Sequence, residues 1–360
     1  MSEKKREIVL DILRVAATCA VVLLHTVTGI MDTTDMSSYP LEKRVFLVVL
    51  DLVCWCVPVF VLISGYLFLN PLREISLRQM LTKYCRRILL ALFLFGVPYA
   101  CLEMMALEKT LRPGMLFKGI FMVLRGESWS HLWYLYMILL LYFLTPAIRC
   151  LLKKLPLWAV YAVLLALLLG SSILPFAKKL LGLEWMWVLP DGGIYFFYYI
   201  CGYLFAAWEK TSSAEVIAQK AYGRQRTRRK QCLLVVVIGV LACGMALSRI
   251  FGNYTVQMAY NYPFTVVLAL LLFGLGLNWQ KNGKKEKRNT GFWEKAGALC
   301  FAVYLIHPVF LNIYYKFLHI SPLDFRIWIS LPLFFLAALL PAFLAAWILR
   351  KVPVLKKYVL

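Results

Sequence analysis

Long apolar segments separated by short polar ones are the main feature of this chain. A helix needs about 20 consecutive apolar residues to cross the hydrocarbon layer of a membrane. Ten segments approach or exceed this length, near residues 9–30, 45–69, 87–107, 132–149, 157–175, 191–208, 231–251, 262–279, 296–315 and 328–349. The pattern predicts an all-α polytopic membrane protein with about ten transmembrane helices. Residues 114–124 are predicted as an additional interfacial segment.

The composition supports this fold class. Hydrophobic residues make up 62% of the chain and charged residues 16%, against roughly 45–50% and about 25% in an average soluble domain. No polar stretch is long enough for a separate soluble domain, so we expect a single transmembrane domain over residues 1–360. The basic start followed by an apolar run resembles a signal peptide, but it has no small-residue cleavage site and contains Arg14. We therefore interpret it as the first helix.

The basic residues are distributed unevenly between the two sets of loops. One set consists of the two terminal tails and every second loop, and it holds 28 of the 40 Lys and Arg residues. The other loops hold 11, and Arg14 lies inside the first span. Loops rich in Lys and Arg are cytoplasmic in most membrane proteins, so both termini are predicted to be cytoplasmic. The net charge of +22 then reflects topology and contact with anionic lipid, and we expect no nucleic-acid partner.

The ten cysteines do not indicate a metal site. Nine of them lie in or at the ends of apolar runs and Cys85 flanks one, with no Cys-x-x-Cys pair and no Cys/His cluster at zinc-ligand spacing. Packing or lipid-facing thiols explain them more simply. We expect no bound metal.

Ionisable residues inside an apolar span are costly and indicate function. Arg14 and His25 lie eleven residues apart in the first span, which is almost three helical turns, so both are expected on one face about 16 Å apart along the axis. Histidine titrates near neutral pH and is the usual general base. The simpler alternatives are that Arg14 reaches back to the cytoplasmic headgroups and that His25 only hydrogen-bonds a neighbouring helix.

Other polar residues fall at the same two depths. Asp51 and Glu103 are expected near the level of His25, where either could orient the imidazole or simply be hydrated at the interface. The residues expected at the level of Arg14 are Ser64, Lys83, Arg86 and Arg87, together with Gly65. Lys83, Arg86 and Arg87 would make this level positively charged. Helix packing would also explain Ser64 and Gly65, and the positive-inside rule would also explain the three basic residues.

Several segments together resemble the bacterial membrane-bound acyltransferase 3 family. The matching segments are Leu10-Asp11-Ile12-Leu13-Arg14 with His25, Val61 to Leu67 around Ser64-Gly65, His131 to Leu135 through Leu141 to Pro146, and Tyr304-Leu305-Ile306-His307-Pro308. The family often has two arginines with two residues between them before the third helix. Here only Lys83 and Arg86 have that spacing, so Lys83, Arg86 and Arg87 all remain candidates for that role.

The resemblance implies transfer of an acyl group, usually acetyl from acetyl-CoA, to a hydroxyl of a cell-surface sugar or related acceptor, in the plasma membrane of a bacterium. The donor is then an acyl-CoA substrate, with no permanently bound cofactor. Its phosphates need cations, which Arg14, Lys83, Arg86 and Arg87 would supply beside Ser64. His25 would be the base, with Arg14 and Asp51 completing the catalytic group.

On the acceptor side we expect Glu103, His131, Trp133 and His307. An aromatic belt at the outer interface would also explain His131 and Trp133, and core packing would also explain His307. A small-molecule exporter or transporter is the alternative function. Transporters are often built from inverted repeats with broken helices, and no convincing internal repeat is present. A sensory or scaffold protein would leave Arg14 and His25 unexplained.

Overall fold

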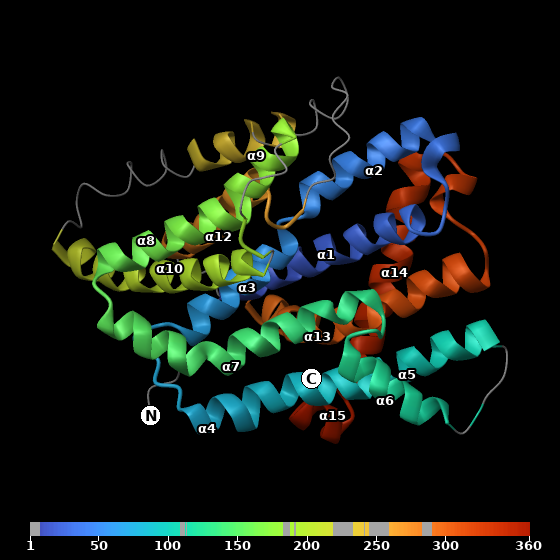
Figure 1. Ribbon diagram of the computed structural model, residues 1–360, viewed down its shortest axis with the longest axis horizontal. Coiled ribbons are helices and arrows are strands. Elements are labelled where there is room, and N and C mark those ends of the chain that lie inside the picture. Colours follow the sequence, from blue (N-terminus) through green and yellow to red (C-terminus); the bar gives the residue numbers. More distant parts are fainter. Residues whose placement is uncertain are drawn as a thin grey trace. The chain divides into compact units, whose positions relative to one another are not determined.

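The computed structural model describes residues 8–108, 112, 114–182, 188–190, 192–218, 233–240, 242–244, 259–282 and 290–360. Within these ranges the regular structure is helical and includes no strand (Figure 1). The helices are α1 (Ile8–Met31), η1 (Met36–Ser38), α2 (Pro40–Val53), α3 (Cys56–Phe68), α4 (Leu77–Gln79), η2 (Met80–Cys85), α5 (Arg86–Glu108), α6 (Met115–Arg125), η3 (Ser130–Leu132), α7 (Trp133–Lys154), α8 (Leu157–Leu168), η4 (Leu169–Ile173), α9 (Leu174–Leu181), α10 (Gly193–Ala218), α12 (Pro263–Asn282), α13 (Thr290–Asn312), η5 (Ile313–Phe317), η6 (Pro322–Asp324), α14 (Ile327–Leu349) and α15 (Pro353–Tyr358).

The prediction of an all-α polytopic membrane protein is confirmed. Seven helical segments in the described ranges are long and apolar enough to cross a membrane: Ile8–Met31, Pro40–Phe68, Leu77–Ala106, Ser130–Lys154, Leu157–Leu181, Gly291–Phe317 and Ile327–Leu349. Shorter apolar helices at Gly193–Trp208 and Pro263–Trp279 match the sixth and eighth predicted spans. In the seventh, residues 233–240 and 242–244 are helical, and the remainder of 231–251 lies outside the described residues.

The second predicted span differs in one detail, because two helices form it. α2 ends at Val53 and α3 begins at Cys56, with Cys54 and Trp55 between them. Pro58 lies in the first turn of α3, where its missing N–H costs no hydrogen bond. The proline therefore lets a new helix start inside an otherwise continuous apolar run.

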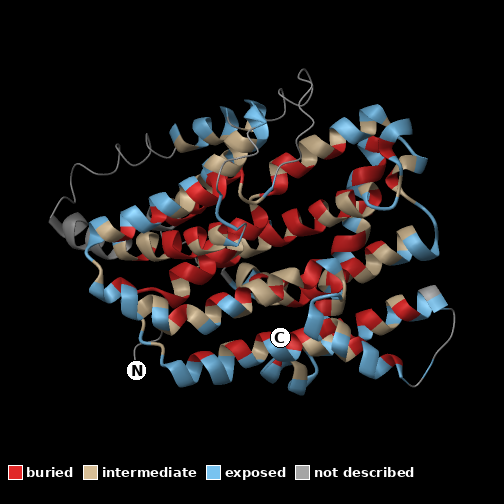
Figure 2. Cartoon of the chain, in the orientation of Figure 1, coloured by how far each residue is buried: buried red, intermediate tan, exposed pale blue. Residues whose placement is uncertain are grey.

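Outward-facing side chains on the helices are large and apolar. Phe143, Trp158 and Leu333 are each more than 60% exposed, and Figure 2 shows exposed residues along the outer faces of helices whose other faces are buried. Apolar surface on this scale would be unfavourable in water and is what a lipid environment covers. Burial thus agrees with a protein that crosses the membrane several times.

The chain forms two compact units that alternate along the sequence. The first unit comprises residues 1–71 and 161–345, and the second comprises residues 72–160 and 346–360. The expectation of a single domain over residues 1–360 stays a prediction. In the first unit α1 packs against α2, α3, α12 and α13, and α3 packs against α10. α1 is therefore covered by other helices on several sides, which suits a helix that carries polar residues.

The crossing of α3 and α10 depends on two glycines. A Cβ atom at Gly65 would lie 2.0 Å from the carbonyl oxygen of Tyr199, and one at Gly202 would lie 2.5 Å from the oxygen of Leu62. Neither space can hold a methyl group. Small residues allow close approach of helices in a membrane, where packing is a main source of helix association. Helix packing is therefore confirmed as a role of Gly65.

In the second unit α6 returns along α5, against which it packs. Its buried residues Met115, Gly119 and Val123 recur every four residues and line one face, whereas Phe117 and Phe121 are exposed. Ser128, just after α6, donates a hydrogen bond to the carbonyl oxygen of Gly96 (2.8 Å). The predicted interfacial segment thus forms a helix that leads the chain back alongside the middle of α5.

Candidate functional site

An ion pair with one buried partner lies in the first turns of α1. Arg14 Nη1 donates to Asp11 Oδ1 at 2.6 Å, and the side chains are 27% and 0% exposed, respectively. A carboxylate with no exposure is stable only with a partner. Arg14 therefore makes a specific contact with a buried carboxylate while part of its own side chain stays exposed. Reaching toward the headgroups alone does not account for its position.

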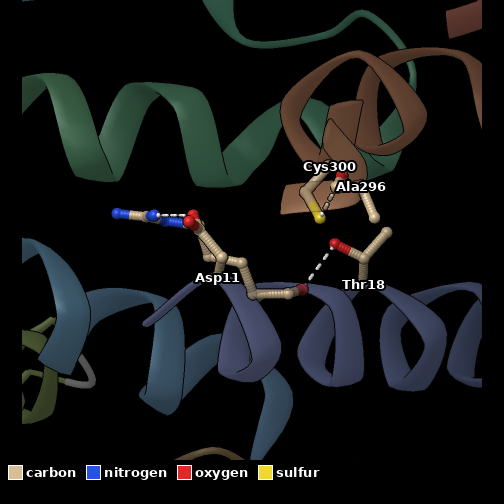
Figure 3. Close-up of polar contacts among 5 residues, drawn as sticks. Asp11, Thr18, Ala296 and Cys300 are labelled. Carbon is tan, nitrogen blue, oxygen red and sulfur yellow. Dashed lines mark hydrogen bonds and ion pairs between the residues drawn. The ribbon is translucent and has the colours of Figure 1, made fainter. Parts of the chain in front are cut away.

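α13 approaches α1 at this ion pair. The nearest backbone is that of Gly297, where an added Cβ would meet three side-chain atoms of Asp11. Further along α1, Thr18 donates to the carbonyl oxygen of Arg14 (2.8 Å), while Cys300 donates to that of Ala296 (3.4 Å). Figure 3 shows Asp11 and Thr18 rising from α1 toward the helix that carries Ala296 and Cys300. The polar end of α1 is thus enclosed by α13.

A second meeting point of α1 and α13 holds two histidines. The ring centroids of His25 and His307 lie 5.2 Å apart, and the ring of Tyr304 lies 6.3 Å from that of His307. His307 is fully buried, and its Nδ1 is 3.1 Å from the carbonyl oxygen of Val303. A carbonyl oxygen only accepts, so Nδ1 carries the hydrogen and the neutral ring presents Nε2 as an acceptor.

The two meeting points show that α1 and α13 run parallel. Asp11 faces Gly297 and His25 faces His307, so residue numbers rise together along both helices. Arg14 and His25 lie on one unbroken helix, as predicted, and both levels of that helix are in contact with α13. Parallel orientation is also what the first and ninth of ten alternating spans require.

Two further predicted residues of the first unit are buried, Asp51 on α2 and Ser64 on α3, at 1% and 8% exposure. Both helices pack against α1. A hydrated position at the membrane surface is therefore wrong for Asp51. Whether Asp51 orients His25 and whether Ser64 contacts the donor stay predictions.

The basic residues of the second unit differ in their surroundings. Arg87 Nε donates to the carbonyl oxygen of Val359 at 2.9 Å, and its Nη2 donates to that of Leu360. Arg86 is exposed with its guanidinium 5.5 Å from the ring centroid of Tyr358. Lys83 is exposed in the π-helical turn η2, a feature often found at functional sites. Lys83 and Arg86 are thus more open to an added anion than Arg87.

An aromatic group surrounds His131 in the same unit. The rings of Tyr99 and Trp129 stack at 4.1 Å with 7° between their planes, and the His131 ring lies 6.0 Å from that of Tyr99. Tyr99 is seven residues before Ala106 at the end of its span, about 10 Å along the helix axis, and His131 is 3% exposed. His131 is therefore buried beside the aromatic rings of its own unit, and its place in an interfacial aromatic belt or on the acceptor side stays a prediction.

The other predicted residues of this unit are less enclosed. Trp133 and Glu103 are both of intermediate exposure, and the ring of Trp133 lies 6.3 Å from that of Tyr134. Their assignment to the acceptor side stays a prediction. The chain also has candidates that the sequence reasoning did not select, namely Asp11, Tyr99 and Trp129. Only Asp11 carried a signal, as an acidic residue within the first apolar span.

Comparisons with known proteins gave one match. Residues 7–351 match the family model Acyl_transf_3, described as an acyltransferase domain. No curated protein and no solved structure matches the chain. The matched region includes α1 and α13, and hence both of their meeting points.

Proposed function

Since the chain belongs to the acyltransferase 3 family and is a membrane acyltransferase, we propose that it moves an acetyl group from acetyl-CoA to a hydroxyl of a cell-surface sugar or related acceptor. The observation that carries this proposal is the pairing of His25 with His307 on two parallel helices of the matched region. A buried titratable pair inside apolar spans is costly and marks a functional site.

The proposed reaction uses His25 as the general base. An alcohol is a weak nucleophile at neutral pH, so an imidazole nitrogen of His25 accepts the hydroxyl proton as the oxygen attacks the thioester carbonyl carbon. The tetrahedral intermediate then expels the coenzyme A thiolate, and the imidazolium returns the proton to that sulfur. One ester bond forms, one thioester bond breaks, and the products are the acylated acceptor and free coenzyme A.

His307 supports this role through its tautomer. Because its Nδ1 donates to Val303, its Nε2 can accept a hydrogen bond from a hydroxyl donor. An acceptor hydroxyl is such a group. We propose that His307 is on the acceptor side and that Asp51 orients His25. The family resemblance implies an acceptor-side role for His131, Trp133 and Glu103 as well, and this role stays a prediction from the sequence.

The donor is proposed to bind at the cytoplasmic end of α1. The Arg14 side chain is 27% exposed and is held by Asp11 through Nη1, and arginine is well suited to bidentate contact with phosphate. Ser64 of the same unit supplies a hydroxyl. The family resemblance implies further positive charge from Lys83 and Arg86, and this stays a prediction from the sequence. Arg87 is already engaged by backbone carbonyl groups, so we assign it the smallest share of donor binding.

Inside-out membrane vesicles from bacteria that express the chain test this function. Acetyl-labelled acetyl-CoA is added outside the vesicles, where it reaches the cytoplasmic face of the membrane. Covalent label in the glycan fraction, absent from vesicles without the chain and from right-side-out vesicles, is the expected result. Label that crosses the membrane only as a free small molecule would instead indicate a transporter.

A further inference from the structure

We propose that Asp11 is a positioning residue, which fixes the guanidinium of Arg14 for the acyl donor, and that Gly297 is the residue of α13 that keeps the Asp11 carboxylate in place. This inference rests on the proposed function, because it concerns the same donor. It adds two residues to the site, one acting through Arg14 and the other through Asp11.

The contact geometry supports an orienting role. The Nη1 atom of Arg14 lies 2.6 Å from Oδ1 of Asp11, three residues earlier on the same helix. A guanidinium has five N–H donors in a rigid planar arrangement, so a short contact to one nitrogen restricts where the other donors can lie. The 27% of the Arg14 side chain that stays exposed is then presented in a defined direction.

Arginine held in this way loses less conformational freedom when it binds an anion. A long side chain that becomes immobilised only on binding loses conformational entropy at that moment, which weakens binding. In the unliganded protein Arg14 is already restricted by its contact with the Asp11 carboxylate. That carboxylate is fully buried and has few alternative positions. The same charge on a lysine would lack the planar geometry.

Gly297 fixes the position of the carboxylate. An added Cβ there would lie 2.7 Å from Cβ, 2.8 Å from Oδ1 and 2.9 Å from Cγ of Asp11. Oδ1 is the atom that accepts from Arg14. A methyl group at residue 297 would therefore displace this oxygen without changing either charged residue, which separates geometry from charge.

The matched control is on the same helix. A Cβ at Gly291 would meet nothing within 4 Å, so Gly291→Ala makes the same chemical change in α13 without touching Asp11. We compare Gly297→Ala, Asp11→Asn and Gly291→Ala with the parent chain in the vesicle assay, measuring KM for acetyl-CoA, kcat and thermal stability in detergent.

Gly297→Ala and Asp11→Asn are each expected to raise KM for acetyl-CoA about tenfold, the order of one hydrogen bond to a charged group. kcat at saturating donor should change less, and Gly291→Ala should match the parent. In an Arg14→Lys background, Gly297→Ala should add no further increase in KM, because the geometry that it disturbs is already lost.

Three outcomes would overturn the inference. A parent chain that neither binds nor uses acetyl-CoA refutes the proposed function and this inference with it. If the parent uses acetyl-CoA but Gly297→Ala and Asp11→Asn keep the KM of Gly291→Ala, only the positioning role is refuted. Loss of thermal stability with an unchanged KM in the folded fraction would make the Asp11–Arg14 pair purely structural. If Asp11→Asn does not fold, Gly297→Ala still decides, because it keeps both charges.

Discussion

Replacing Gly65 by alanine is expected to destabilise the contact between α3 and α10. The added Cβ would lie 2.0 Å from the carbonyl oxygen of Tyr199 and 2.8 Å from its carbonyl carbon. Ordinary van der Waals contact begins near 3.4 Å, so the two backbones must separate by about 1 Å or more. Both contacts are with backbone, which cannot rotate away as a side chain can.

The cost follows from this geometry. Overpacking a well-packed core costs about 1–3 kcal/mol, and a clash with a helix backbone belongs at about the upper end of that range. The separated helices would also lose close packing around Gly202, on which the same crossing depends. We therefore expect about 3 kcal/mol of destabilisation for Gly65→Ala.

Thermal unfolding of the purified protein in detergent measures the effect. Gly274→Ala on α12 is the control, because its Cβ would lie 3.5 Å from the ring of Phe205, an ordinary contact. Equal melting temperatures for Gly65→Ala, Gly274→Ala and the parent would refute the packing interpretation.

Three further predictions follow from the site and the topology. Reporter domains that are active only in the cytoplasm, fused after Lys230 and at the C-terminus, should both be active because basic loops stay inside; inactivity of either would contradict the proposed orientation. Arg14→Lys should raise the acetyl-CoA concentration needed for half-maximal binding about tenfold, since lysine lacks the planar set of guanidinium donors. Titration curves that coincide for the two proteins would remove Arg14 from the donor site. Asp51→Asn should lower kcat less than His25→Ala does, because an orienting carboxylate acts only through the imidazole; an unchanged kcat would show that Asp51 is a buried structural residue.

Much of the fold follows from the length of the apolar runs. The described parts of the ten predicted spans are helical apart from short turns and bends, such as that at Cys54 and Trp55, because only helices and closed barrels satisfy the backbone within lipid. The break at Cys54 and the return of α6 along α5 could not be predicted in this way. Pro58 permits a new helix to start after the break but does not require one. The return of α6 depends on local packing, such as the hydrogen bond from Ser128 to Gly96, which leaves no periodic signal.

The candidate site was predictable along one helix but not between helices. Arg14 and His25 share α1 because their spacing fits whole helical turns. That His307 lies opposite His25, and that Gly297 lies against Asp11, depends on which helices are neighbours and in which register. Periodicity gives the buried face of a helix but not the helix that covers it. The roles of these residues in catalysis stay predictions.

The role of His25 as the general base is the central claim, and the rate of acetyl transfer by His25→Ala tests it most directly. The variant is compared in inside-out vesicles with the parent and with His319→Asn, a control in an exposed loop where asparagine tolerates the positive φ of 52°. Acetyl-CoA binding by the purified proteins confirms that each variant is folded. General-base catalysis contributes about 10²–10⁴-fold, so His25→Ala should bind the donor normally and lose acetyl transfer by that factor, whereas His319→Asn keeps the parental rate. Transfer at the parental rate by folded, donor-binding His25→Ala protein would contradict the account.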